Sequence, residues 1–372
     1  MAVDQAGAVT RDRPLRIAMV VPPWLPVPPP GYGGVEQVVA GLVDALVLHG
    51  HAVTLFGVGD QHGTAARSFV STAPDVQFAR LGESLPELAH LARVNHLIKA
   101  ADFDLIHDHT VVGPLVAGRR AVPTVATVHG NPVGEHGDVL TDTDRGVGLV
   151  AISHGQRRLN PGLPWAGTVH NALDPRSIPY KDEPAAGPVL WLARFSPDKG
   201  PDVAIRACRA AGLPLLLAGK CNEPAERQYY DEVIEPMLGE DVTVVVNADR
   251  EATLRMLVEA RCLIMPIRWE EPFGMVMVEA MATGTPVVAL ARGAVPELVR
   301  SGVTGLVCER SEELPDALHA VERLDPADCV AHVAENFSTT RMAYSYEAVY
   351  RQFLAGVGAR SDVTEPVRLR AR

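Results

Sequence analysis

The stretch EPFGMVMVEAMATGTPVVA (residues 271–289) shows the architecture of the chain most clearly. It predicts an apolar helix over 274–283, followed at once by a strand over 286–291. The strand is an almost unbroken apolar run, which is typical of a parallel sheet covered by helices on both faces. The stretch therefore predicts one helix-and-strand unit of an α/β fold.

The same alternation extends in both directions along the chain. A first series of strands is predicted at 15–21, 52–57, 105–107, 123–129 and 148–152, and a second at 188–193, 214–218, 242–246, 262–266 and 286–291. Prolines and a glycine between 171 and 187 break any regular element, which places a joint there. The sequence thus predicts two Rossmann-like, doubly wound domains, 1–172 and 173–337, facing a central cleft. A last helix is expected over about 338–354 and a disordered tail over 355–372.

Composition limits the classes of function. The chain has 372 residues, 47% apolar and 21% charged, with a net charge of −11. This acidity argues against nucleic acid as a partner, and it makes contact with an anionic membrane unlikely. No apolar run approaches the ~20 residues of a membrane span, and the first 14 residues lack the apolar segment of a secretory signal. Five cysteines without a C-x-x-C pair favour reduced thiols, so a cytoplasmic location is expected.

Two carboxylates in the opening stretch indicate a polyol ligand. Glu271 and Glu279 are eight positions apart, and Pro272-Phe273-Gly274 between them is expected to form the first turn of the helix. The first turn of a helix has free N–H groups and the positive end of the helix dipole. Carboxylates accept hydrogen bonds from hydroxyls, and the N–H groups donate to them.

With its neighbours, this stretch resembles the signature of family 4 glycosyltransferases of the GT-B fold. Further likenesses follow in family order over most of the chain. They are GYGG with Glu36 (31–36), DLIHDH (104–109), TVHG (127–130), AIS (151–153), HNALD (170–174), ARFSPDKG (193–200) and the last helix, which resembles one that crosses back to the first domain. One such motif would be weak, but the ordered set is specific.

The resemblance implies retaining transfer of a sugar from a nucleotide-sugar donor to a hydroxyl acceptor. It implies that Glu279 accepts hydrogen bonds from the ribose. Glu271, with the N–H groups of Phe273, Gly274 and Met275, would hold the donor sugar. His129 would lie beside the anomeric centre. In this family a departing phosphate oxygen is thought to take the acceptor proton, so His129 is not assigned as a general base.

The leaving diphosphate needs positive charge around it. Arg194 and Lys199 follow the end of a predicted strand and face the cleft, so they are expected to stabilise the charge that develops. Gly33 and Gly34, which lead into a helix, add backbone N–H groups from the opposite wall. With these groups present, no metal and no cofactor is expected. The catalytic candidates are therefore His129, Glu271, Arg194 and Lys199.

The acceptor side is expected to include Tyr32, His109 and Ser153. His107 and His109 lie two positions apart on one strand face, the spacing of a structural pair or, less readily, of two metal ligands, but no third ligand has suitable spacing. Ser153 is placed at the hinge or on the acceptor side.

Departures from the family pattern leave the donor base and the acceptor open. Ala172 stands where glycine is usual, and the segment ending at Arg250, expected to approach the base, also differs. A UDP-sugar is favoured over a GDP-sugar. No basic or amphipathic patch is obvious in the first domain, so the expected acceptor is a small, soluble molecule, such as a natural product or sugar intermediate. The alternatives are a nucleotide-sugar epimerase or hydrolase of the same fold, or a non-catalytic nucleotide-sugar-binding protein.

Overall fold

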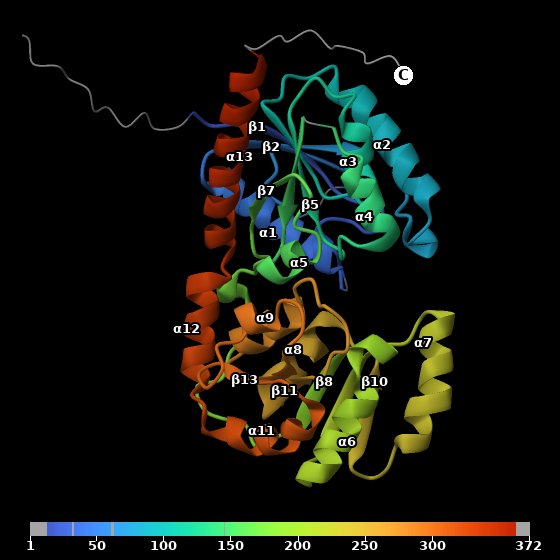
Figure 1. The fold of residues 1–372 in the computed structure, drawn as a ribbon, viewed down its shortest axis with the longest axis vertical. Helices are drawn as coiled ribbons and strands as arrows, with labels where there is room; N and C mark the ends of the chain where they lie inside the picture. The colour runs from blue at the N-terminus through green and yellow to red at the C-terminus, as the bar shows by residue number, and fades with distance from the viewer. Residues whose placement is uncertain (1–12, 32, 61–62, 145, 362–372) are drawn as a thin grey trace, which may run out of the picture.

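The computed structural model describes residues 13–31, 33–60, 63–144 and 146–361, with side chains up to residue 357. Two parallel β-sheets, each covered by helices, form the upper and lower halves of the molecule in Figure 1. The α/β fold with two doubly wound units that the sequence predicts is confirmed.

The first sheet contains seven parallel strands in the order β3-β2-β1-β4-β5-β6-β7. They are β1 (Arg16–Val20), β2 (Ala52–Gly57), β3 (Ser68–Ser71), β4 (Leu105–Asp108), β5 (Thr124–Val128), β6 (Val147–Ala151) and β7 (Trp165–Thr168). The connecting helices are α1 (Gly34–Leu48), α2 (Ser84–Ile98), α3 (Gly113–Ala117), α4 (Gly134–Thr141) and α5 (His154–Leu159). The central strands β4, β5 and β6 are buried along their whole length, which explains their continuous apolar sequences.

The second sheet contains six parallel strands in the order β10-β9-β8-β11-β12-β13. They are β8 (Val189–Arg194), β9 (Leu215–Lys220), β10 (Val242–Val246), β11 (Cys262–Met265), β12 (Val287–Leu290) and β13 (Gly305–Cys308). The helices are α6 (Pro201–Ala211), α7 (Pro224–Tyr229), α8 (Arg250–Glu259), α9 (Met275–Ala282), α10 (Val295–Leu298), α11 (Leu314–Ala320) and α12 (Pro326–Asn336).

Both sheets reverse their strand order beside the first strand, between β1 and β4 above and between β8 and β11 below. In sheets of this kind ligands bind outside the carboxyl ends of the strands, at the reversal. The loops after β5 and β11 touch: Asn131 donates from Nδ2 to the carbonyl oxygen of Glu270 at 2.8 Å. The carboxyl edges of the two sheets therefore face each other.

The final helix, α13 (Thr339–Ser361), joins the two halves. It follows α12 in the lower half and then runs along the upper half, where it packs against α1 (Figure 1). The sequence places its end near 354, whereas the helix continues to Ser361, so residues 355–361 of the expected disordered tail are helical. Once a helix has formed, each further residue adds a hydrogen bond, and Gly356 and Gly358 each cost only about 1 kcal/mol relative to alanine. Residues 362–372 lie outside the described part of the chain.

Among the described residues, no helix combines the length and apolar character needed to cross a membrane.

Candidate functional site

Three cations gather at the carboxyl edge of the second sheet. Arg194 ends β8, Lys220 ends β9, and the two are register partners in neighbouring strands. Lys199 follows in the short turn after β8. The Arg194 guanidinium is partly exposed and lies 3.8 Å from Oε1 of the buried Glu226. Sequence reasoning found Arg194 and Lys199 but missed Lys220, although Lys220 also ends an apolar strand.

Lys199 and Glu271 form a largely buried ion pair. Nζ of Lys199 lies 2.5 Å from Oε2 of Glu271, and both side chains are about nine-tenths buried. The indole Nε1 of Trp269 donates to the same carboxylate oxygen at 2.8 Å, while the ammonium lies 4.5 Å from the centre of the indole ring. A cation near an aromatic face gains further attraction. Trp269, which the sequence analysis did not single out, therefore holds both charged partners.

Glu271 is followed by the start of α9. The helix begins at Met275, and Gly274 is its N-cap with φ 93°. Phe273 and Gly274 therefore form the turn before the helix, and the expectation that they belong to its first turn is wrong. Only glycine adopts such a backbone easily, and a Cβ at Gly274 would also lie 2.4 Å from Cε of Met277.

A second ion pair links α8 to α9. NH1 of Arg250 lies 2.5 Å from Oε1 of Glu279, and the glutamate side chain is only 16% exposed. The structure thus brings together two residues that the sequence analysis assigned to the nucleoside end of the donor. We call Arg194, Lys199, Lys220, Arg250, Glu271 and Glu279 the charged wall.

The first sheet presents histidines at its carboxyl edge. Nδ1 of His109 lies 2.9 Å from Nε2 of His129, and the two rings are stacked. His107 lies beneath them, within 2.8 Å of the hydroxyls of Thr127 and Tyr350. We call these three histidines the histidine wall.

Burial keeps the histidine wall uncharged. It lowers the pKa of His129 to about 4 and that of His107 to about 3. The pKa of His109 is lowered well below its usual value, again mainly by burial. His129 is half-buried, whereas His109 is buried behind it. Of the two, only His129 is exposed enough to contact a ligand. His109 is therefore not in contact with the acceptor, and its role is to position His129.

The loop that contains Gly33 leads from the carboxyl end of β1 into α1. Gly33 is the N-cap of α1 and Gly34 its first residue. A Cβ at Gly33 would lie 2.8 Å from Cγ of Pro29, so this close approach requires glycine. Burial raises the pKa of Glu36, in the first turn of α1, to about 7. Burial thus favours the uncharged form of this carboxyl, which repels a nearby anion less than the charged form would. Tyr32, the third acceptor-side candidate, lies outside the described residues.

Ser153 is a joint residue. It is fully buried, its Oγ donates to the carbonyl oxygen of Pro272 at 2.6 Å, and it accepts from the N–H of Gln156 as N-cap of α5. With no exposed surface it cannot meet an acceptor, so its acceptor-side assignment is corrected to the hinge, the other position considered for it.

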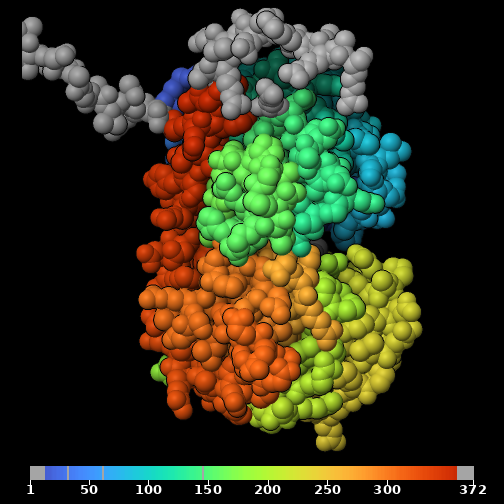
Figure 2. All heavy atoms as spheres, in the orientation of Figure 1, coloured from blue at the N-terminus to red at the C-terminus, as the bar shows by residue number. Residues whose placement is uncertain are grey.

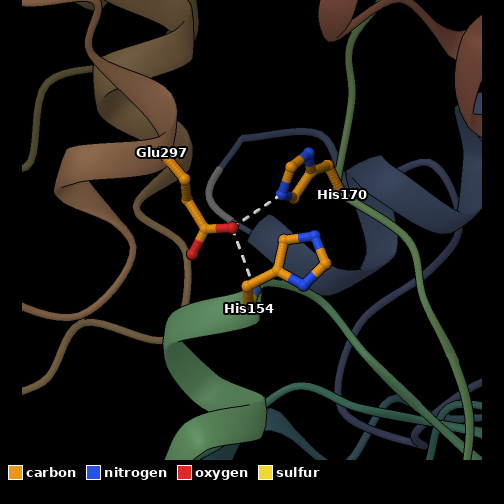
Figure 3. Close-up of side chains that lie close together, drawn as sticks. All are labelled: His154, His170 and Glu297. Carbon is orange, nitrogen blue, oxygen red and sulfur yellow. Dashed lines mark hydrogen bonds and ion pairs between the residues drawn. The ribbon is translucent and has the colours of Figure 1, made fainter.

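A second joint connects the halves through Glu297 on α10 (Figure 3). Its carboxylate accepts from the backbone N–H groups of His154 and Gly155, at 2.9 and 2.8 Å, and lies 3.0 Å from Nε2 of His170. Ligand atoms of His154, His170 and Glu297 lie within 4.8 Å of one another, a grouping that could hold a metal ion. The sequence analysis weighed a metal only at His107 and His109, where the described residues supply no carboxylate within reach.

Two doubly wound sheets that meet at their carboxyl edges are the architecture of the GT-B class of glycosyltransferases. Residues 32–205 match the model of glycosyltransferase family 4, and residues 186–329 match the model of glycosyl transferases group 1.

Individual proteins that resemble this chain belong to the same class as the two family models. A D-inositol 3-phosphate glycosyltransferase of Mycolicibacterium gilvum is 28% identical, over 94% of this chain and 91% of that protein. The crystal structure of AviGT4, a glycosyltransferase of avilamycin A biosynthesis, is 26% identical with a TM-score of 0.73, over 92% of this chain and 99% of that one. Anabaena HepE with UDP-glucose shares the fold at 18% identity and TM-score 0.67, over 93% and 100%. The chain belongs to the family 4 glycosyltransferases of the GT-B fold and is an enzyme that transfers sugar from a nucleotide sugar.

Proposed function

We propose that the protein is a retaining, metal-independent glycosyltransferase that moves a hexosyl or related sugar from a UDP-sugar to a hydroxyl of a small acceptor. The observation that carries the proposal is the Lys199–Glu271 pair at the strand ends, with the His129 segment facing it. Asn131, two residues after His129, bonds to the backbone of Glu270. The segment that follows the histidine and the carboxylate segment are therefore in contact.

The charged wall suits the departing diphosphate. As the glycosidic bond breaks, negative charge grows on the phosphate oxygens, and fixed cations nearby lower the barrier. We assign this role to Arg194 and Lys199 and add Lys220, which lies beside Arg194 in the sheet. These three residues supply the positive charge, which is why we propose that no metal or other cofactor is required.

The remaining residues orient the donor and the acceptor. Glu279, with Arg250 beside it, takes the ribose and nucleobase end, and Glu271 takes sugar hydroxyls with the N–H groups of Phe273, Gly274 and Met275. Donor binding must then replace the Lys199–Glu271 contact by contacts from phosphate to Lys199 and from hydroxyl to Glu271. His129, being uncharged, can hydrogen-bond the sugar without attracting the diphosphate to the wrong side. The free thiols of all five cysteines support the cytoplasm as the proposed compartment.

A donor panel tests the proposal first. Thermal unfolding is followed with UDP-, GDP-, ADP- and dTDP-glucose, and a donor that binds the folded state stabilises it by about 2.7 kcal/mol at a hundredfold excess over its Kd. We expect UDP-glucose to give the largest shift, with or without EDTA. A larger shift with another base would overturn the UDP assignment, and loss of turnover with EDTA would overturn metal independence.

Measurements of turnover then distinguish a glycosyltransferase from an epimerase or hydrolase and from a non-catalytic binding protein. With an acceptor present, the configuration of the new glycosidic bond, read by proton NMR, is expected to match that of the donor. Conversion of the donor alone at full rate would instead favour the epimerase or hydrolase. Donor binding without product from any acceptor in a broad screen would favour a non-catalytic binding protein.

A further inference from the structure

Exposed apolar side chains gather on one side of the site. Among the described residues of the upper half, seven of them lie in connections that follow strands or in the first turn of the next helix. They are Val76, Phe78, Leu81, Leu85, Val111, Leu115 and Val133, with 40–67% of their surface exposed. We call these seven residues the apolar rim. In the described part of the second-sheet half, from β8 to α12, only Val246 is exposed in this way.

The members of the apolar rim lie together at the carboxyl edge of the first sheet. Glu87, in the first turn of α2, accepts from the N–H of Val112 at 3.1 Å, which fixes the start of α2 beside the loop after β4. The helices α3 and α4, which follow β4 and β5, are also in contact. The three connections that carry the rim are therefore neighbours at this edge of the sheet.

The rim borders the space between the halves. At one end, the ring of Phe78 lies 5.8 Å from Nζ of Lys220 on the charged wall. At the other end, Val133 follows Asn131, which bonds to Glu270. Val111 follows the buried His109 by two residues. Figure 2 shows the surface hollowed between the two halves on the side of α7. A molecule whose hydroxyl points toward His129 would therefore lay its remaining part along the rim.

We propose that the apolar rim is an acceptor subsite for an aliphatic or aromatic portion of the acceptor, beyond the hydroxyl that receives the sugar. This rests on the proposed function and narrows its acceptor class. Binding sites for small molecules are lined mainly by apolar side chains with a few polar groups that fix orientation. Exposed apolar side chains that gather in one region mark sites where a ligand or a partner binds.

The charges around the rim favour a small molecule, and not an anionic membrane, as the ligand of the rim. Arg80, within the rim, is paired with Glu83 at 2.6 Å. The net charge of the chain is −11, whereas anionic lipid surfaces attract clusters of unpaired Lys and Arg. The Phe78–Lys220 contact also turns this part of the rim toward the second sheet.

A homologous series of ligands tests the subsite. Methyl, butyl, hexyl and octyl β-glucoside, each below its micelle concentration, are titrated into the UDP-loaded protein by calorimetry. We expect affinity to rise about two- to fourfold per added methylene, as burial of apolar surface predicts. The double variant Val111→Ser, Leu115→Ser is expected to flatten this dependence. Leu48→Ser, an equally simple change at a leucine that is 78% exposed at the end of α1, is the matched control and keeps the dependence.

Results that differ from these expectations contradict either the acceptor subsite or the proposed function. Affinity independent of chain length, or equal loss with Leu48→Ser, overturns the subsite. Co-sedimentation with phosphatidylglycerol vesicles, or a dimer in sedimentation velocity, overturns it if the rim variant abolishes either, because a lipid surface or a second copy then occupies the rim. If no nucleotide sugar shifts the melting temperature, the proposed function fails. If UDP-glucose binds and the alkyl series is flat, only the subsite fails.

Discussion

The charged wall and the histidine wall solve opposite electrostatic problems. On the charged wall, Lys199 and Arg250 each already lie 2.5 Å from a glutamate. On the histidine wall, burial removes charge altogether. The donor side is therefore suited to an exchange of partners, because a ligand that contacts Lys199 or Arg250 replaces an ion pair within the protein. The histidine side is built to stay unchanged while the donor binds.

The largest effect is expected from Lys199→Ala. Loss of one group that stabilises developing charge typically costs about 10²–10³ in rate, and here it also leaves Glu271 without its cation. We expect kcat with UDP-glucose to fall by about this factor. If the rate stays within threefold, the charged wall does not act on the diphosphate.

Stability has to be separated from catalysis in that variant. A buried carboxylate left unpaired destabilises the fold. The double variant Lys199→Met, Glu271→Gln removes both charges, so it is expected to recover most of the melting temperature without recovering activity. Recovery of both would mean that Lys199 only balances Glu271.

A smaller effect is expected at the nucleoside end. Glu279→Ala removes hydrogen bonds from a charged group, each of which contributes about 1.5–3 kcal/mol. Affinity for UDP, measured by calorimetry, should therefore fall at least tenfold. Glu251→Ala is the control, because its carboxylate lies next to Arg250 in sequence but is exposed to solvent. Unchanged UDP affinity in Glu279→Ala would contradict the ribose assignment.

Acid should weaken the histidine wall. The pKa of His129 is about 4 in the fold and about 6.5 when unfolded. The unfolded chain therefore binds more protons between these values, and stability falls as the pH drops from 6.5 to 4. Each such histidine contributes up to about 1.4 kcal/mol per pH unit. His129→Asn should reduce the slope of unfolding free energy against pH by that amount, measured by urea titration at several pH values. The control is His96→Gln, an exposed histidine of α2; equal slopes in all three proteins would refute the prediction.

The smallest effect is expected at Glu297, whose carboxylate connects the two halves of the molecule. Glu297→Gln keeps one acceptor oxygen for α5 but cannot satisfy all three donors that approach the carboxylate. We expect a loss of about 1–2 kcal/mol in unfolding free energy, with kcat little changed. His154→Ala removes only the side chain and leaves the backbone N–H that Glu297 accepts. If His154→Ala costs more stability than Glu297→Gln, the joint does not depend on the carboxylate.

Periodicity and strand ends were enough to predict the second half. The apolar strands and α9 follow from residues 271–289, and Arg194 and Lys199 are found because each follows an apolar strand. The same signal was available for Lys220, which ends β9 in the same manner. Ser153 precedes a helix, and a serine in that position commonly caps it, so its buried role could also have been inferred.

Other features depend on contacts that spacing does not reveal. Strand β3 is short and half-exposed, with no apolar run to mark it. Tyr346 and Tyr350 are one helical turn apart, but the threonine and histidine that they contact lie 219 and 243 positions away. The apolar rim is likewise invisible in sequence, because its scattered apolar residues come near one another only when three connections meet at one edge of the sheet.

The return of α13 sets the order in which the histidine wall is completed during synthesis. His107 emerges from the ribosome early, but its partner Tyr350 follows more than 240 residues later. At a synthesis rate of about 5–20 residues per second, roughly 12–50 seconds pass before His107 can contact the hydroxyl of Tyr350. Until then the groove that α13 fills on the first sheet is open. The first domain, although made first, can therefore complete its contacts only after α13 has been synthesised.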